Sequence, residues 1–250
     1  MTRALFLAAG VGSRLGVEAN RAKCTYEVGD GPLIANTMRK MAAAGISTAV
    51  VVGFCKDSVA AALADFPEVR FFENPFYRIT NSIGSLWIAR EYLQESAEQG
   101  EDIILANADV FWGDDILKRL SGYQSQAVML GDHSRAQVGD YFFQLQDGQI
   151  VAYGKQLAPE QRSCEYVGAA KLAAGFLPTF IANLERLIWN EDYDMWWEDV
   201  LYRSCAEFPV EVIDVEGAFW AEVDYIDDYR RILQHEGLNE DEFLQRMKLA

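Results

Sequence analysis

Short apolar runs alternate with longer amphipathic stretches along the first half of the chain. The apolar runs have the length of buried strands and lie at residues 3–9, 46–53, 69–74 and 102–109. Stretches with helical periodicity lie between them, at residues 32–44, 56–66 and 81–95. Strands that alternate with helices form a mostly parallel sheet covered by helices. The pattern therefore predicts an α/β fold.

The pattern changes after residue 125. From about 126 to 174 the period shortens toward two, and residues 141–154 predict a hairpin with Asp147 and Gly148 in its turn. The chain then continues with helices at 177–189 and 197–207, a pair of strands within 210–223, and helices at about 225–234 and 239–248. With no repeat or long linker, we expect one domain with an antiparallel subregion and a helical C-terminal tail.

Composition and charge narrow the class of protein. The 250 residues are 50% hydrophobic and 24% charged, as in an ordinary globular protein with a sizeable core. A formal net charge of -16 disfavours nucleic acid and anionic lipid as partners. The 4 cysteines match no metal or redox spacing, which indicates reduced thiols and a cytoplasmic protein. No apolar run is long enough for a membrane span.

A glycine-rich loop follows the first strand, in the segment LAAGVGSRLG at residues 7–16. Glycines let backbone N–H groups converge on phosphate oxygens, and Arg14 adds a positive charge. The loop could instead be a tight turn without a ligand, or a dinucleotide fingerprint. Its spacing of Gly10, Gly12 and Gly16 misses that fingerprint by one residue, and the second strand ends without an acid. A nicotinamide cofactor is therefore disfavoured.

Carboxylates end two of the apolar strands. Asp109 comes at the end of one, where open α/β sheets bind ligands. Glu222 and Asp224 end another and, two residues apart, share one face of it. Such oxygens suit Mg²⁺, with water and phosphate completing the shell. Taken singly, Asp109 could start a turn and Asp224 could cap a helix, but together with the glycine loop they favour a metal site.

Two lysines and an aromatic cluster complete the candidate chemistry. Lys23 and Lys155 lie beside apolar segments, where they could meet an anionic substrate or simply be solvated. Residues 193–202 combine aromatic rings with carboxylates, which together can bind an ammonium group. A buried aromatic stripe at the start of a helix is the alternative. The residues concerned are Tyr193, Asp194, Trp196, Trp197, Glu198, Asp199 and Tyr202.

These elements resemble the nucleotidyltransferase superfamily, most closely the CTP:phosphocholine and 2-aminoethylphosphonate cytidylyltransferases. The resemblance runs over nearly the whole chain. Its segments are LAAGVGSRLG, Lys23 with the following PLIANTM, NPFYRITNSIGSLWIARE, LANADVF, the Gly-Lys pair at 154–155, EYVGAAKL, MWWEDV and WAEVDYIDDY. Ala22 stands where the family usually has proline before the loop lysine.

The resemblance implies a Rossmann-like three-layer sandwich with a mostly parallel mixed sheet. A single nucleotidyltransferase domain would span residues 1–250. Within it, residues 1–125 would form the nucleotide half, about 126–210 the acceptor subregion, and about 211–250 the metal strand and C-terminal helices. The resemblance also implies nucleotide binding by Ala8, Ala9, Gly10, Gly12, Ser13, Asn81, Ser82 and Ala108, with Mg²⁺ on Asp109 and Asp224.

The implied reaction transfers CMP from CTP to a small amine-bearing phosphate or phosphonate and releases pyrophosphate. Arg14 and Lys23 would contact the triphosphate, and Lys155 the acceptor. A phosphate monoester has a second pKa of about 6, so it needs no general base to act as nucleophile. The acceptor amine would lie near Tyr193, Trp196, Trp197, Glu198 and Asp199.

Other classes of function remain open from the residues alone. A sugar-1-phosphate nucleotidyltransferase would share the nucleotide half but would bind its sugar with planar polar side chains. A glycosyltransferase would need an acid at the same strand end, although the local sequence Asn107-Ala108-Asp109 has only one. A non-catalytic nucleotide-binding module is the third alternative. We expect a monomer or a homodimer.

Overall fold

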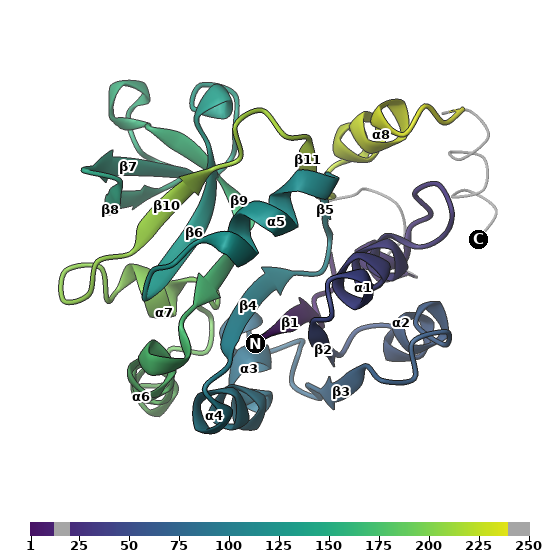
Figure 1. Ribbon diagram of the computed structural model, residues 1–250, viewed down its shortest axis with the longest axis horizontal. Helices are drawn as coiled ribbons and strands as arrows, with labels where there is room; N and C mark the ends of the chain where they lie inside the picture. Colours follow the sequence, from purple (N-terminus) through teal and green to yellow (C-terminus); the bar gives the residue numbers. More distant parts are fainter. Residues whose placement is uncertain (13–20, 240–250) are drawn as a thin grey trace.

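A mixed sheet of nine strands runs through the molecule in the order β3-β2-β1-β4-β9-β6-β10-β8-β7 (Figure 1). The computed structural model describes residues 1–12 and 21–239. Strands β8 and β9 run opposite to the others, because their pairings with β10, β7, β4 and β6 are antiparallel. The strands are β1 (Thr2–Ala8), β2 (Ser47–Val52), β3 (Arg70–Glu73), β4 (Asp102–Asn107), β6 (Ala127–Asp132), β7 (Phe142–Gln146), β8 (Gln149–Gly154), β9 (Cys164–Leu172) and β10 (Glu211–Asp214).

Helices cover both faces of this sheet. One face carries α3 (Ser82–Ile88), α4 (Arg90–Gln99), α6 (Leu177–Trp189) and α7 (Asp199–Tyr202), whose apolar side chains share one core cluster with the sheet. The other face carries α1 (Leu33–Ala43), α2 (Lys56–Ala62) and α5 (Asp114–Gly122), which share a second cluster. The predicted three-layer α/β sandwich with a mixed sheet is confirmed.

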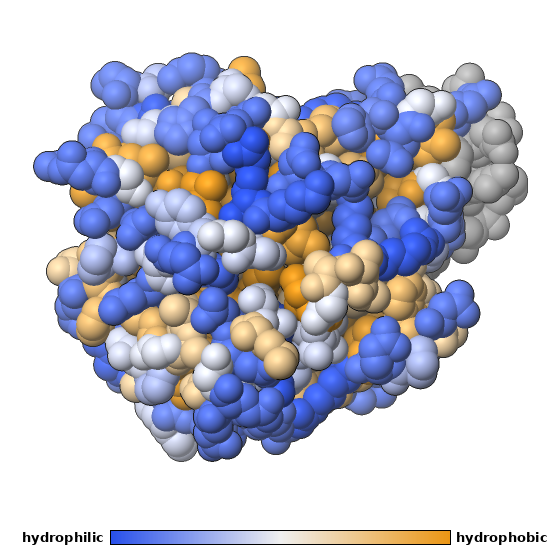
Figure 2. Space-filling model, in the orientation of Figure 1, coloured by the Kyte–Doolittle hydropathy of each residue, from blue (hydrophilic) through white to orange (hydrophobic). Residues whose placement is uncertain are grey.

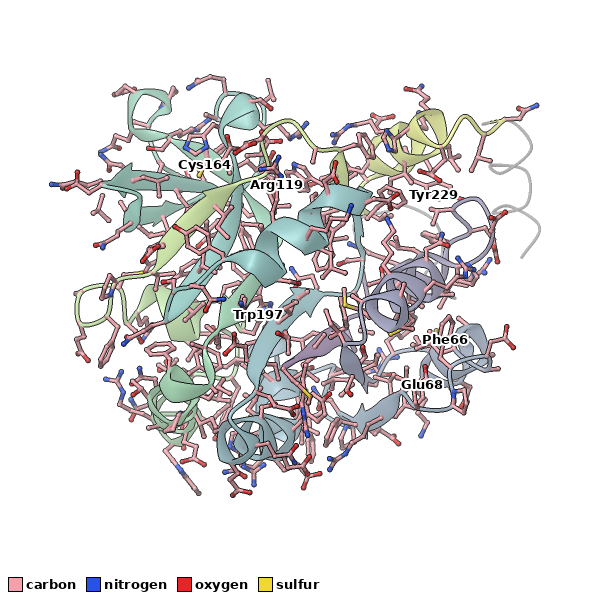
Figure 3. The ribbon with its side chains drawn as sticks, viewed as in Figure 1. Phe66, Glu68, Arg119, Cys164, Trp197 and Tyr229 are labelled. Atoms are coloured by element: carbon pink, nitrogen blue, oxygen red, sulfur yellow. The ribbon has the colours of Figure 1, made fainter. Side chains whose placement is uncertain are left out.

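A small second sheet lies beside the main one (Figure 1). It pairs β5 (Val110–Trp112) with β11 (Trp220–Glu222) in antiparallel register. Helix α8 (Ile226–His235) follows and packs on this sheet in a third core cluster. Its residue Tyr229, labelled in Figure 3, is fully buried and donates a hydrogen bond to the Glu27 carbonyl. This segment attaches the last part of the described chain to the first helices.

Short 3-10 turns complete the chain and lie mainly in the connections. They are η2 (Lys23–Thr25), η3 (His133–Arg135), η4 (Pro159–Gln161) and η5 (Ala174–Phe176). Polar residues cover most of the face seen in Figure 2, and apolar residues gather toward its centre. Within the described residues, no helix combines the length and apolarity needed to cross a membrane.

Two of the expected helices differ from the structure, and a third is not tested by it. The helix expected over 81–95 is two helices, α3 and α4, because the backbone of the fully buried Ala89 leaves helical geometry at φ -91°, ψ 11°. The helix expected at 197–207 is the short α7 alone. The helix expected at 239–248 lies almost wholly outside the described residues.

The strands expected within 210–223 do not pair with each other. Strand β10 joins β6 in the main sheet, whereas β11 joins β5 in the small one. Glu216 and Gly217 both have positive φ, 51° and 76°, so the chain turns sharply between the two strands. This turn carries β11 away from the main sheet and toward Asp109.

Candidate functional site

A cleft of about 430 Å³ opens at the carboxyl ends of β1 and β4, the edge at which open α/β sheets bind ligands. Residues of the glycine loop and of the segments after β4 and β11 line it. Its lining includes most of the predicted site residues, namely Ala8, Ala9, Gly10, Gly12, Lys23, Asn81, Ser82, Ala108, Asp109, Lys155, Trp196, Glu198 and Asp224. Segments from the beginning, middle and end of the chain therefore meet in one place.

Two carboxylates and one lysine meet in a corner of the cleft. The Lys23 ammonium contacts an Asp224 carboxylate oxygen and lies 3.5 Å from Asp109 Oδ2. Backbone pairing holds the two acids together: the Val223 amide donates to the Asp109 carbonyl at 2.9 Å, directly beyond the β5–β11 ladder. The distance between the two carboxylates thus depends on the register of that ladder.

The position of Lys23 depends on the glycine loop. Gly12 has φ +64°, and a Cβ placed on it would come within 2.7 Å of Lys23 Cε and 2.8 Å of its Cγ. The aliphatic part of Lys23 therefore lies directly against the backbone of Gly12. Ala22 has φ -67°, ψ 135°, close to the φ that proline would impose, so the chain enters Lys23 as a proline would direct it.

Burial and charge shift the pKa values in this corner. Burial lowers the pKa of Lys23, but Asp109, Asp224 and Glu222 outweigh it and raise that pKa overall. Burial also raises the pKa of Asp109, against the opposing effect of Lys23. The pKa of Glu222 is raised well above its usual value, first by burial and then by Asp109 and Asp224. More negative charge is buried here than Lys23 alone can balance.

This donor set fits a divalent cation. Mg²⁺ in nucleotide enzymes is bound by one or two carboxylates and completed by water and substrate phosphates. Asp109 and Asp224 already converge on one positive charge, the Lys23 ammonium, which shows that both can face a cation at once. Among the described residues, no group of three or more His, Cys, Asp or Glu side chains is arranged for a metal. Water and substrate oxygens would supply the remaining ligands.

Asn107 connects this corner to the rest of the cleft. Its Nδ2 donates to Glu198 Oε1 at 3.3 Å and to Glu222 Oε1 at 3.4 Å. Tyr166 also donates its hydroxyl to Glu198, at 3.2 Å. Burial raises the pKa of Glu198 to about 7, although these hydrogen bonds oppose the shift. Glu198 is thus a buried carboxyl group that changes charge near neutral pH.

Aromatic rings surround the end of the cleft that contains Glu198. Tyr202 stacks on Tyr141 at 5.6 Å between ring centroids, and Trp196 packs edge-on against Tyr141 at 5.7 Å. The Lys155 ammonium lies 5.8 Å from the centre of the Trp196 ring and forms an ion pair with Asp140. This end combines ring faces, one buried carboxyl group and one lysine.

The structure does not bring every predicted residue to the cleft wall. Trp197, labelled in Figure 3, is fully buried and donates its indole N–H to Asn107 Oδ1 at 2.9 Å. Asp199 accepts from the Trp196 amide at the start of α7, and Tyr193 lies on the surface, where its carbonyl accepts from the Asn81 amide. All three support the walls of the cleft rather than line it. Ser13 and Arg14 lie outside the described residues.

Sequence reasoning missed other lining residues. Tyr141 and Tyr166 come from the antiparallel subregion and Asp140 from the loop before β7, and Tyr77 lines the opposite wall. A periodicity near two shows which strand residues share a face, but it does not show which face turns toward a cleft. The sequence contains only a weak indication that Asn107 belongs to the site: it stands two residues before Asp109, at the end of the same strand.

One part of the cleft is built around the start of α3. The Asn81 side chain accepts from the Ser82 amide and caps this helix. Ser82 Oγ accepts from the Trp197 amide at 2.9 Å, which joins α3 to the segment before α7. Thr80 and Ser85 line the same wall. This wall therefore presents small polar groups to a ligand.

Comparison with known proteins gives consistent matches. The family model for the MobA-like NTP transferase domain matches residues 4–177. The CTP:phosphoglutamine cytidylyltransferase of Campylobacter jejuni is 26% identical over 90% of this chain and 96% of its own length. The 2-aminoethylphosphonate cytidylyltransferase of Lancefieldella rimae is 25% identical over 90% of this chain and 89% of its own.

A solved structure shows the same fold. The CTP:phosphocholine cytidylyltransferase of Streptococcus pneumoniae superimposes with a TM-score of 0.75 at 19% identity, covering 93% of this chain and 98% of that one. At 93% coverage, this match extends past residue 177, where the family model ends.

Proposed function

The chain belongs to the MobA-like NTP transferase domain family, and we propose that it transfers CMP from CTP to a small phosphate or phosphonate that carries an amine. The reaction releases pyrophosphate and depends on Mg²⁺. The cytidylyltransferase relatives support the choice of CTP and of this acceptor class. We further propose that residues 1–250 act as one nucleotidyltransferase domain.

One observation carries the proposal: Asp109 and Asp224, 115 positions apart in the chain, converge on a single positive charge beside the glycine loop. Burial raises the pKa of Asp109 and so makes its charged form costly, although Lys23 opposes this effect. Partly buried acids that converge at the binding edge of an α/β sheet are typical of a functional site.

On the nucleotide side, we assign Gly10, Gly12 and the neighbouring backbone to the triphosphate. Lys23 and Arg14 neutralise its charge. Asp109 and Asp224 would hold Mg²⁺, which when bound supplies further positive charge to the phosphates and the departing pyrophosphate. Asn81 and Ser82 lie on the wall assigned to the base and ribose. Catalysis is then mainly positioning and charge neutralisation.

On the acceptor side, we assign the amine to Glu198 and the rings of Tyr141, Trp196 and Tyr202. A carboxylate together with aromatic faces binds an ammonium group through both charge and cation–π attraction. Lys155 binds the acceptor oxyanion. These side chains favour an amine over a sugar, whose several hydroxyl groups need planar polar partners.

The proposed reaction needs no side chain as general base. A phosphate monoester is mostly dianionic above its second pKa of about 6, so its oxygen can attack the α-phosphorus directly while the bond to pyrophosphate breaks. Neither His133 nor His235 lines the cleft. The chain's own task is to align this oxygen with the α-phosphorus and exclude competing orientations.

Pyrophosphate release tests the proposal. The protein is incubated with each of the four nucleoside triphosphates, Mg²⁺ and a panel of acceptors: 2-aminoethylphosphonate, phosphocholine, an amine-free phosphonate of similar size and glucose 1-phosphate. We expect turnover with CTP and an amine-bearing acceptor, and loss of turnover after removal of the metal by EDTA. Turnover with glucose 1-phosphate alone would refute the acceptor class, and no turnover with any pair would refute the reaction.

A further inference from the structure

A buried carboxylate outside the cleft holds the loop whose last residue, Asp140, pairs with Lys155. Glu165 lies near the start of β9, where it pairs with Asp132 of β6 and Phe142 of β7. It is only 5% exposed and does not line the cleft. A buried carboxylate at such a three-strand junction is costly unless its oxygens are paired.

Both oxygens of Glu165 are used by the same loop. Oε2 accepts from Arg135 Nε, and Oε1 accepts from the Asp140 amide at 2.8 Å. The two donors lie five residues apart, so one carboxylate fixes both ends of the segment 135–140. Charge-assisted hydrogen bonds of this kind are about twice as strong as neutral ones.

The loop passes directly over this carboxylate. A Cβ placed on Gly139 would come within 2.2 Å of Glu165 Cδ. Any larger residue there would have to displace Glu165 or the loop. Only glycine permits this close approach, which brings the next residue, Asp140, to the edge of the cleft.

Asp140 in turn fixes the position of the Lys155 side chain. Its carboxylate accepts from the ammonium of Lys155, the residue that directly follows β8. The same ammonium lies over the Trp196 ring. Held in this way, the positive charge of Lys155 points into the cleft rather than toward bulk water.

Arg135 connects the same cluster to the metal corner. Its guanidinium lies 5.5 Å over the ring of Trp220, two residues before Glu222 in β11. The Trp220 indole donates to Asp132 Oδ2 at 2.8 Å. The loop at the acceptor end is therefore fixed to the strand that leads to Asp224.

We propose that Glu165 is a positioning residue for the acceptor: it fixes the Asp140 backbone, and through Asp140 it aims Lys155 at the acceptor oxyanion. The role of Lys155 rests on the proposed function. Glu165 itself touches neither substrate. The structural part, that Glu165 orders the loop, stands independently of turnover.

Hydrogen exchange tests the structural part without any substrate. In Glu165→Ala we expect the amides of residues 136–143 to exchange about tenfold faster than in the parent protein. The amides of α4 should be unchanged. Glu101→Ala is the matched control, because Glu101 is also a partly buried acid bonded by an arginine, Arg3, but at the far end of β4. Unchanged exchange at 136–143 in Glu165→Ala would overturn the proposal whether or not the protein turns over.

Steady-state kinetics tests the link to Lys155. In Glu165→Gln we expect the KM for the acceptor to rise about tenfold while the KM for CTP stays within about twofold. In a Lys155→Ala background the same substitution should have almost no further effect, because the two residues act in series. An equal rise in both KM values, or full additivity with Lys155→Ala, would show a merely structural role. If the parent protein shows no turnover, the proposed function fails, and hydrogen exchange still decides the positioning role.

Discussion

The two ends of the cleft each contain a lysine held by carboxylates, and the difference between them is informative. Lys23 is surrounded by Asp109, Asp224 and Glu222, and its side chain is 11% exposed. Lys155 forms an ion pair with Asp140, and its side chain is 34% exposed. The first end is enclosed and rich in negative charge, whereas the second is more open and lined by aromatic rings.

This difference suggests that the two ends of the cleft have different tasks, one in binding cations and the other in selecting the ligand. Excess buried negative charge, as around Lys23, attracts cations strongly. Substitutions at such a site are costly, because they leave a buried charge without its partner. An open aromatic pocket with one lysine discriminates among ligands by shape and by weaker contacts. We therefore expect substitutions near Lys23 to abolish turnover, and those near Lys155 to change which acceptor is used.

The largest effect is expected from Asp109→Asn. Removing one preorganised group that stabilises the transition state typically costs about 10²–10³ in kcat, or about 3–4 kcal/mol, and Asp109 would act in this way by holding Mg²⁺. We expect that loss here, measured as pyrophosphate release at saturating CTP and acceptor. Asp102→Asn is the control, since Asp102 stands at the opposite end of the same strand and pairs with Lys171. Equal activity losses in both variants would mean that the acid acts only through stability.

The second effect concerns pH and Glu198, whose pKa is raised by burial to about 7. A carboxyl group whose folded pKa exceeds its unfolded value binds its proton more tightly in the folded state. Its contribution to stability is greatest below the unfolded pKa and falls as pH rises toward 7. The free energy of unfolding of the parent protein, minus that of Glu198→Gln, should drop by roughly 3 kcal/mol between pH 4 and pH 8.

Urea titrations of the two proteins across this pH range measure that difference. Parallel curves would contradict the buried, titrating carboxyl group. An amine-bearing acceptor should partly reverse the loss at pH 8, because an ammonium group stabilises the charged form of Glu198.

A smaller effect is expected from Gly12→Ala. Alanine in the left-handed region costs about 1–2 kcal/mol, and its Cβ would also collide with Lys23. We expect a lower melting temperature together with weaker CTP binding, measured by calorimetry. Gly10→Ala is the control for stability, because a Cβ there meets nothing within 4 Å. If the two variants melt together, the close contact between Gly12 and Lys23 does not matter.

The smallest effect is expected from Trp196→Ala. Loss of one aromatic face should raise the KM for an amine-bearing acceptor by about five- to tenfold, or about 1 kcal/mol, and leave CTP binding unchanged. Trp189→Ala is the matched control, because that ring is 79% exposed on the surface. A change in the KM for CTP instead would place Trp196 on the nucleotide side.

The sequence predicted the layered fold well because its signals are local. Apolar runs and amphipathic stretches marked every strand of the parallel half, and the Asp147-Gly148 turn marked the hairpin, where both residues have positive φ. The pairing partners of β10 and β11 were not predictable in this way. They depend on a turn at Glu216 and on strands about 85 and 110 residues earlier in the chain.

The candidate site shows the same division. Strand ends indicated Asp109 and Asp224, and the structure brings both to one corner of the cleft, while their metal-binding role stays a prediction. Trp197 looked like Trp196 in the sequence, yet one lines the cleft and the other is in the core. The sequence alone does not show which of two adjacent tryptophans lines a cleft, because that depends on the residues packed around each one. The positions of Tyr141 and Glu165 depend on such tertiary contacts too.

The small β5–β11 ladder also matters for how the protein is made. During synthesis most of the main sheet can assemble before β11 leaves the ribosome, but Asp109 then has no Asp224 beside it. The proposed cation site would form only when β11 and α8 dock, so a bound divalent ion should stabilise this late segment by mass action. When divalent metal is removed, proteases should therefore cleave within residues 215–239 before they cleave the rest of the fold.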